Sequence, residues 1–450
     1  MQPDWIKSWQ ACSGAVVARR GRQPCGASPG AAAAARAISH KMAASRPITV
    51  AALGVAQILG WGSSFYFPAV LAQPIAADTG WSLGWVVSGT SIGLLVAGLI
   101  APLVGTQIDR RGGRPVLAAA SLLNAAGLAG IGLAPNLPVY LLAWVVVGAG
   151  MGCGLYDAVF AALGKLYGQT ARTAITNLTL FGGFASTVCW PLSALLAETF
   201  GWRGACLVYA LLHLGVALPL QLAVMPPLRR AADTAPDDRS AAAEEASDGA
   251  AGASPASPAS RELPVLVLLA LVLTVSAGIG SIVVVHLLIF LQARGVDYAL
   301  AVTLGTLFGP AQVGARLIER LFGARYHPVW TMVASCLLML IGLAMLLVAF
   351  PLPALTILIY GAGYGIMWIA RGTLPLALFG AGRYATLMGR LAFPSLIVQA
   401  LAPSGGAWLI EARGADVTMI MLTGFAALNV ALIAALWVVA RRLNTAGRHP

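Results

Sequence analysis

The chain has 450 residues, of which 59% are hydrophobic and only 10% are charged, whereas an ordinary soluble protein has roughly 45–50% apolar and about 25% charged residues. A soluble globule of this size with so few charges lacks polar side chains to face water. The apolar residues gather in blocks of about 20 to 25, each long enough to cross a hydrocarbon core of roughly 30 Å as a helix. The composition therefore disfavours soluble enzymes, nucleic-acid binders and disulfide scaffolds, and indicates an all-α polytopic membrane protein.

Hydropathy predicts 12 transmembrane helices in two sets of six. The first set is 48–74, 84–108, 115–134, 138–163, 174–199 and 203–225. The second set is 264–291, 298–321, 328–350, 354–379, 385–411 and 416–440. The stretch between the sets is rich in Pro, Ala and Ser and too poor in large apolar residues to fold. We therefore expect two six-helix bundles, at 47–225 and 264–442, joined by a disordered cytoplasmic linker at 226–263.

The two ends of the chain are predicted to be tails. Residues 1–46 are basic and contain no apolar stretch long enough for a signal peptide, so we expect a disordered cytoplasmic tail. Met42 directly precedes the first span and is an alternative start of translation. Residues 443–450 are expected to form a short cytoplasmic tail.

The distribution of Lys and Arg predicts the orientation. If the N-terminus is cytoplasmic, the loops on the opposite side hold only Arg203, Arg294 and Arg413, and three more arginines lie within spans. The other 22 of the 28 basic residues then face the cytoplasm. The net charge of +12 is thus mostly a topology signal toward anionic membrane lipids and not a nucleic-acid surface. We expect an integral protein of a bacterial inner membrane with both termini in the cytoplasm.

The two halves resemble each other at an offset of 213 residues. The run GAGMG at 148–152 recurs as GAGYG at 361–365, and Pro115 recurs as Pro328. The pairs Glu198 with Glu411 and Gly201 with Gly414 follow the same offset. The chain is therefore predicted to consist of two homologous six-helix bundles, an arrangement that places a site at their interface and permits one half to rock on the other.

A loop motif between the second and third predicted spans points to a family. Its residues are Gly105, Asp109, Arg110, Gly112 and Arg114. They resemble the G-x-x-x-D-R-x-G-[RK]-[RK] loop of the major facilitator superfamily, although Gly113 stands where a basic residue is common. The resemblance covers about residues 47–442 and implies the fold of that superfamily. It also implies that Asp109 acts as a conformational latch with the other half when the cytoplasmic side is closed. The alternative is that the loop only enforces topology.

Within that superfamily the chain is most similar to oxalate/formate antiporters and monocarboxylate porters. Those carry a cationic residue in the eighth span, and the antiporters carry another in the eleventh; Arg316 and Arg390 occupy similar places here. The first span, GWGSSFY at 60–66, is similar to their Gly- and Trp-rich first helix. Monocarboxylate porters often have an acid one turn before this arginine, and here that position is Gln312. The chain therefore lacks the Asp–Arg pair that would couple transport to a proton in those porters.

Charges within spans are costly, by at least ~2.5–3.5 kcal/mol each, and so need a partner or a function. The predicted spans contain the arginines Arg316, Arg371 and Arg390 but only one acid deep within a span, Asp157. This excess of positive charge suggests a cavity for an anion. A guanidinium suits two-point contact with a carboxylate. Under the repeat, Arg371 lies one residue beyond the counterpart of Asp157, so the two are predicted to pair when the cavity is empty and to separate when substrate binds. A permanent structural ion pair is the alternative.

Other candidates have structural alternatives as well. Arg316, with Gln312 one turn earlier, either binds substrate or bridges to Glu319. Arg390 either lines the site or pairs with Asp109. Aromatic and histidine candidates are Trp61, Tyr66 and His286, for which packing or, for His286, a hydrogen-bonded core position is the alternative. Weaker candidates are Gln57, Tyr156, Asn177 and Trp368.

These features predict a monomeric secondary transporter of a small organic anion, such as a mono- or dicarboxylate, that works by alternating access. The coupling partner is either a proton or a counter-substrate. No Walker A motif is present, and we expect neither a cofactor nor a metal. Efflux of a drug or an arsenite-like metalloid is the alternative, since cysteines lie within spans. A polytopic membrane enzyme is a more remote one.

Overall fold

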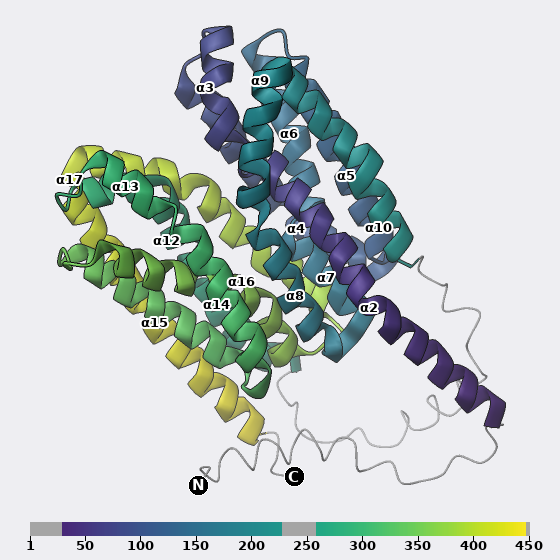
Figure 1. Ribbon diagram of the computed structural model, residues 1–450. Helices are drawn as coiled ribbons and strands as arrows, with labels where there is room; N and C mark the ends of the chain where they lie inside the picture. The colour runs from purple at the N-terminus through teal and green to yellow at the C-terminus, as the bar shows by residue number, and fades with distance from the viewer. Residues whose placement is uncertain (1–28, 227–257, 447–450) are drawn as a thin grey trace. The chain divides into compact units, whose positions relative to one another are not determined.

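The computed structural model describes residues 29–226 and 258–446, and their regular structure is entirely helical (Figure 1). Residues 1–28 of the tail predicted at 1–46, residues 227–257 of the linker predicted at 226–263 and residues 447–450 of the tail predicted at 443–450 lie outside the described residues. The chain divides into a unit at Met1–Pro47 and a unit at Ile48–Pro450. The second unit contains both halves of the repeat. Its N-terminal half is residues 48–224 and its C-terminal half is residues 258–446.

The helices of the N-terminal half begin with one that crosses the unit boundary. They are α2 (Pro29–Ser63), α3 (Phe67–Thr79), α4 (Leu83–Arg111), α5 (Gly113–Gly132), α6 (Leu137–Gly154), α7 (Tyr156–Tyr167), α8 (Ala171–Gly183), α9 (Ala185–Leu212) and α10 (Leu218–Val224). Helix α2 starts well before the predicted first span, within the predicted tail. Its first turns contain the alanine run at 31–35, and alanine has the highest helix propensity. A 3₁₀ turn at Gly168–Thr170 and a π-helix at His213–Ala217 complete this half.

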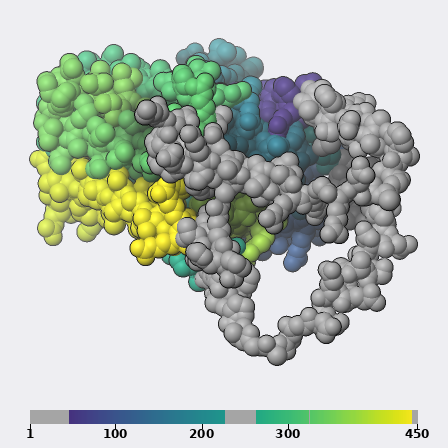
Figure 2. All heavy atoms as spheres, turned by 90° about the horizontal axis from the view of Figure 1, so that it is seen from below, coloured from purple at the N-terminus to yellow at the C-terminus, as the bar shows by residue number. Residues whose placement is uncertain are grey.

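The helices of the C-terminal half are fewer and longer. They are α12 (Pro258–Gln292), α13 (Tyr298–Gly305), α14 (Phe308–Phe322), α15 (Pro328–Leu347), α16 (Pro353–Phe379) and α17 (Tyr384–Ala446), with a 3₁₀ turn at Gly323–Arg325. Figure 2 shows these helices, green to yellow, gathered beside the purple and blue ones of the N-terminal half.

Eight helical stretches of the described residues are long and apolar enough to cross a membrane. The stretch Leu137–Val224 has 88 residues and folds back twice, and Tyr384–Arg442 has 59 residues and folds back once. These two stretches therefore supply five crossings. The pair α13 and α14 supplies one more crossing, although each is too short to cross alone. The predicted 12-helix arrangement is thus confirmed.

The internal repeat is visible in the backbone at two glycines. Gly201 (φ 69°, ψ 170°) separates the fifth crossing from the sixth, and Gly414 (φ 85°, ψ 165°) separates the eleventh from the twelfth. A positive φ with extended ψ reverses the chain without a loop, and it is a conformation that glycine adopts far more readily than other residues. The offset of 213 residues thus places the same sharp turn in both halves.

Four crossings are interrupted instead of being continuous helices. The first breaks at residues 64–66, the fourth at Leu155, the fifth at Phe184 and the eighth at residues 306–307. Pro68 lies at the start of α3 and Pro310 near the start of α14, and proline disfavours helical geometry in the residue before it. Hydropathy predicts each as one span because a break of one to three residues does not change mean hydropathy.

The two halves contact each other through α4 with α17, α7 with α17, and α8 with both α14 and α16. Two glycines permit the closest approach. A Cβ added at Gly105 would lie 2.4 Å from the Ala385 carbonyl oxygen, and one added at Gly389 would lie 2.3 Å from the Ala101 carbonyl oxygen. Gly105 of the loop motif is therefore a point where two helix backbones touch.

We predict that Gly414→Ala lowers the free energy of unfolding by about 1–2 kcal/mol, because a side chain in the left-handed region carries that cost. Gly424→Ala in the same helix is the matched control, because both positions have open space around the added Cβ. It should stabilise the protein by about 0.5–1 kcal/mol. Thermal unfolding in detergent measures both; equal effects of the two substitutions would contradict the prediction.

Candidate functional site

An ion pair joins the two halves near the middle of the membrane-spanning region. Arg371 of α16 donates from Nε to Asp157 Oδ1 at 2.7 Å and from Nη2 to Asp157 Oδ2 at 2.9 Å. Such a bidentate, charge-assisted geometry is among the strongest side-chain hydrogen bonds. The Arg371 side chain is 2% exposed and that of Asp157 is 16% exposed, so the carboxylate is the more accessible partner.

The break in the fourth crossing positions Asp157. Leu155 is extended (φ −79°, ψ −173°), and α7 restarts at Tyr156, which places Asp157 in the first turn of a helix. The partial positive charge of a helix N-terminus stabilises a carboxylate there. The side chain of Gln57 donates to the Gly154 carbonyl at 2.6 Å, just before the break. In the other half α16 is continuous, so Arg371 projects from an unbroken helix.

A second buried arginine lies between the halves without an ion pair. Arg316 of α14 is 3% exposed. It donates from Nε to the Gly365 carbonyl at 3.0 Å, from Nη1 to the Thr179 carbonyl at 2.6 Å and from Nη2 to Gln312 Oε1 at 3.2 Å. All three acceptors are neutral. In the described part of the chain no carboxylate pairs with this guanidinium, so its positive charge is uncompensated.

Four aromatic rings from both halves pack together beside the ion pair. This aromatic cluster consists of Trp61, Tyr156, Tyr364 and Trp368, whose contacts have ring centroids 5.1–6.2 Å apart. The guanidinium carbon of Arg371 lies 5.6 Å from the centroid of the Trp368 ring, within the range of a cation–π contact. The indole N–H of Trp61 is buried without an acceptor among the described residues.

A cavity lies against the cluster and the ion pair. Its lining includes Trp61 and Trp368 from the cluster and Asp157 from the ion pair, together with small and apolar side chains of α4, α6 and α17. It is therefore bounded by both halves. A polar ligand that entered it would meet one carboxylate, which is already paired with the Arg371 guanidinium.

The structure brings together some of the predicted site residues and separates others. Arg371, Asp157, Arg316, Gln312 and Trp61 all lie at the contact between the halves. Tyr66 is half-buried and belongs to the same region: its ring centroid lies 6.4 Å from that of Trp61, and its hydroxyl interacts electrostatically with Tyr156, Tyr364 and Arg316.

Two predicted residues lie apart from this contact. His286 is buried, with Nδ1 3.0 Å from the Ile282 carbonyl of its own helix, and its ring packs beside Phe290. Arg390 is exposed, and neither a hydrogen bond nor an ion pair joins it to the described residues of the site. Both stay predictions; the position of His286 favours its alternative, a hydrogen-bonded core histidine.

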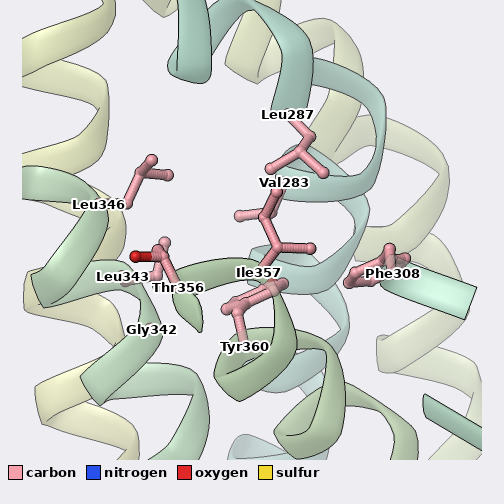
Figure 3. A pocket seen from close by; sticks show the side chains of 9 residues that line it. All are labelled: Val283, Leu287, Phe308, Gly342, Leu343, Leu346, Thr356, Ile357 and Tyr360. Carbon is pink, nitrogen blue, oxygen red and sulfur yellow. The ribbon is translucent and has the colours of Figure 1, made fainter. Parts of the chain in front are cut away.

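A separate, mostly apolar cavity lies inside the C-terminal half (Figure 3). Its lining residues are Val283, Leu287, Phe308, Gly342, Leu343, Leu346, Thr356, Ile357 and Tyr360. It contains no charged side chain, so it offers nothing to balance an ionic ligand.

Asp109 joins the two halves at one end of the molecule. Its Oδ2 accepts from the backbone N–H of Thr386 at 2.9 Å and from the Thr386 hydroxyl, and its Oδ1 lies 3.9 Å from Lys165 Nζ. Thr386 is in the first turn of α17, where free N–H groups attract an anion. Arg390, the alternative partner in the sequence, is not the residue that binds Asp109.

A second contact joins the halves at the same end with the charge reversed. The 213-residue offset places Phe322 at the counterpart of Asp109, so the acid is missing there. Arg172, in the first turn of α8, instead donates to the carbonyl of Gly323 and, at 2.8 Å, to that of Tyr326. Arg320 donates to Asn177 beside it. The cation therefore lies on the helix N-terminus and the acceptors are carbonyls beyond the end of α14.

The opposite end of the two halves lacks such contacts. No hydrogen bond joins α3 to the C-terminal half among the described residues, and Figure 1 shows α3 and α13 well apart. Described hydrogen bonds thus hold the halves together at the Asp109 end, and none joins α3 to the C-terminal half.

Sequence reasoning missed several of these residues. Arg172, Lys165 and Thr386 lie at helix ends outside any motif. The 213-residue offset gives one signal, because the counterpart of Thr386 is Thr173, which directly follows Arg172. Tyr364 follows the second glycine of GAGYG, a run whose repeated glycines indicate helix packing and nothing of the ring between them. The carbonyls of Thr179 and Gly365 carry no side-chain signal at all.

Comparisons with known proteins identify the family. A model of the "Major Facilitator Superfamily" matches residues 52–391. The chain belongs to the major facilitator superfamily. It is accordingly an integral membrane protein, and its family is one of transporters and not of enzymes.

Relatives of known sequence match only part of their own length. The chain is 35% identical over 142 residues to monocarboxylate transporter 3 of Rattus norvegicus, which covers 30% of this chain and 27% of that protein. It is 34% identical over 136 residues to an uncharacterized 38 kDa protein of Thermoproteus tenax, which covers 30% of this chain and 35% of that protein. The chain thus spans about a third of the length of these relatives.

Solved structures share the fold across most of the chain. The human organic anion transporter MFSD10 (TETRAN) has a TM-score of 0.65 at 17% identity, over 86% of this chain and 99% of that one. The proton:xylose symporter XylE has a TM-score of 0.64 at 14% identity, over 86% of this chain and 94% of that one. At these identities the likeness shows the fold and nothing of the substrate.

We predict that Asp157→Asn destabilises the protein more than Arg371→Met. Removing one partner of a buried ion pair costs about 3–5 kcal/mol, but a carboxylate left alone takes up a proton whereas a guanidinium stays charged. The double substitution should cost less than the sum, with a coupling energy of about 1–3 kcal/mol. Thermal unfolding of the four proteins measures this; additive effects would show that the two residues do not interact.

We predict that Asp109→Ala and Arg172→Ala each open the Asp109 end. The measurement is the distance between nitroxide labels at Arg111 and Arg325, one exposed residue in each half, in a background with the native cysteines replaced by alanine. Each substitution should raise the long-distance population about threefold, which corresponds to a loss of roughly 0.6–0.7 kcal/mol of closed-state stability. Arg110→Ala is the control because Arg110 is exposed. An unchanged distribution in both variants would mean that these contacts do not hold the end closed.

Proposed function

We propose that the protein is a secondary active transporter that moves a small organic anion, such as a mono- or dicarboxylate, across the membrane. The observation that carries this proposal is the buried, uncompensated guanidinium of Arg316 between the halves. A desolvated charge in a membrane protein needs a partner or a function. The neutral acceptors around Arg316 do not balance its charge, and a bound anion would supply the missing negative charge.

The donor inventory of Arg316 supports the same conclusion. A guanidinium has five N–H groups, and three of them donate to Gly365, Thr179 and Gln312. The other two are available to a carboxylate. With Arg371 balanced by Asp157, Arg316 gives the contact between the halves one net positive charge. An anion that bound there would complete the charge balance of the site.

The names of the similar proteins agree with this substrate class without establishing it. One matching relative is a monocarboxylate transporter, and one structural neighbour is an organic anion transporter. The sequence match to the former covers only 27% of that protein. The proposal for this chain therefore depends on its own arginines.

The hydrogen bonds that hold the halves together at the Asp109 end, with none described between α3 and the C-terminal half, fit one state of an alternating-access cycle. We infer from the excess of Lys and Arg that the Asp109 end faces the cytoplasm of a bacterial cell and contacts anionic lipid, with both termini on that side. We propose that the protein works as a monomer, coupled either to a proton or to a counter-anion. Substrate binding engages the two remaining N–H groups of Arg316, and the Asp109 and Arg172 contacts exchange for others when the site opens to the cytoplasm.

The experiment is counterflow in proteoliposomes that contain the full chain. Vesicles are loaded with unlabelled oxalate or lactate, and uptake of the same labelled anion is measured. Arg316→Ala should reduce exchange at least about tenfold, because a lost charged hydrogen bond to a ligand costs roughly 1.5–3 kcal/mol. Arg316→Lys should be intermediate, because it keeps the charge with fewer donors. Arg413→Ala, an exposed loop arginine, is the control and should exchange normally.

Either of two results would overturn the proposal. The first is normal exchange by Arg316→Ala in protein that elutes and melts like the wild type. The second is no exchange with any carboxylate while arsenite or a cationic drug is transported, which would establish the efflux alternative instead.

A further inference from the structure

A buried serine and histidine form a hydrogen bond inside the N-terminal half, away from the arginines. The hydroxyl oxygen of Ser63 lies 2.8 Å from His213 Nε2, and the hydroxyl also donates to the Leu59 carbonyl at 2.7 Å. Ser63 is 0% exposed and His213 is 2% exposed. His213 Nδ1 is buried and has no hydrogen-bond partner among the described residues.

These contacts fix the tautomer of His213. A serine hydroxyl has one proton. When that proton is directed at the Leu59 carbonyl, the oxygen accepts from His213 Nε2–H, and both contacts are satisfied. His213 Nδ1 then carries no proton and is a bare base. A buried acceptor without a donor is costly, so this nitrogen is the kind of group that calls for a functional reason.

Both residues lie at irregular points of their helices. Ser63 is the last residue of α2, directly before the break in the first crossing. His213 is the first residue of the π-helix, and the Leu218 N–H bonds back to the His213 carbonyl across five residues. Short π-helical turns within α-helices are frequent at functional sites. The serine–histidine hydrogen bond therefore links two helix distortions.

The break is connected to the aromatic cluster. Trp61 precedes Ser63 by two residues and packs on Tyr156 and Trp368, and Phe65 within the break contacts Trp61 at a centroid distance of 5.5 Å. A change at the serine–histidine pair is thus only two residues away from the cavity between the halves.

No charged side chain of the described residues compensates His213. The π-helix packs against α5, α9 and α10, and α2 contributes Ser63. From Ile48 onward α2 has no titratable side chain, and neither does α10. The titratable residues of α5 and α9 are Arg114, Cys189, Glu198, Arg203, Cys206 and Tyr209.

None of those residues forms a hydrogen bond or an ion pair with His213. Glu198 is exposed, and Arg203 binds the carbonyls of Gly132 and Ala134. The Tyr209 hydroxyl binds Ser193 and the Cys189 carbonyl. The surroundings of His213 in the described chain therefore suit the neutral imidazole.

We propose that His213 Nδ1, held in position by Ser63, is a proton-binding site that biases the conformational equilibrium of the transporter. The inference rests on the alternating access of the proposed function but not on its substrate. The buried, unpaired position disfavours the imidazolium in the state with the Asp109 end closed. A ligand shifts an equilibrium only through its different affinity for the two states. A proton on His213 therefore favours the other state of the cycle, in which Nδ1 gains water or a hydrogen-bond acceptor.

The test is the distance between nitroxides at Arg111 and Arg325 in the full chain, in proteoliposomes without substrate, at about pH 8 and about pH 5, on either side of the usual pKa of histidine. Acidification should raise the long-distance population of otherwise unmodified protein about threefold. His213→Gln should abolish this response, because the amide N–H₂ still donates to Ser63 but supplies no titratable base.

Two histidine controls exclude other sources of pH dependence. His286→Gln should keep the response. His327→Gln should keep it as well, because His327 directly precedes α15 in the C-terminal half and lies outside the serine–histidine pair and the helices packed against it. If His213→Gln does not fold, Ser63→Ala serves instead and should at least halve the response, because the tautomer is no longer fixed.

An absent pH response in the parent protein, or one retained by His213→Gln, would overturn the proton site. Because no substrate is present, a failure of carboxylate exchange leaves this result unaffected. A lost pH response in His213→Gln together with no carboxylate exchange by the parent would retain the proton site and reject the substrate class.

Discussion

The bidentate pair of Asp157 and Arg371 is the interaction on which the arrangement of the two halves depends. Each of these charges alone would be expensive within hydrocarbon, and each comes from a different half. Their neutralisation therefore requires the halves to be together at this depth. The partial exposure of the carboxylate toward the cavity gives the pair a second property, because a group that is open on one side can exchange its partner.

The broken helices follow from the same requirement. Backbone polar groups in a membrane must be satisfied within the protein, and interrupted crossings leave carbonyls that need donors. The Gly154 carbonyl accepts from Gln57, and the Thr179 carbonyl, near the end of α8, accepts from Arg316. At both of these breaks a polar side chain of the protein reaches the irregular backbone and supplies the missing donor. The same carbonyls hold Arg316 in place without neutralising it.

The sequence was sufficient for the fold and for part of the site. Charge scarcity and hydropathy predicted twelve crossings, and the 213-residue repeat paired Gly201 with Gly414, where the structure has matching turns. The pairing of Asp157 with Arg371 was predicted because opposite charges at equivalent depth have few other partners. Helix breaks were not predicted, since they depend on a few residues. The contacts of Arg172 and His213 were also missed, because their acceptors are backbone carbonyls or a serine hydroxyl that no composition signal reveals.

The backbone contact of Gly105 with Gly389 has a mechanical consequence. Two helices that touch without side chains between them do not interlock, so they can rotate about the point of contact while it is kept. This point lies close to the Asp109 end, so each half extends much farther from it toward the α3 side than toward the Asp109 side. A small rotation there moves the distant α3 and α13 ends by a much larger amount. The glycine contact thus allows one half to rotate on the other and confines the larger displacements to the α3 side.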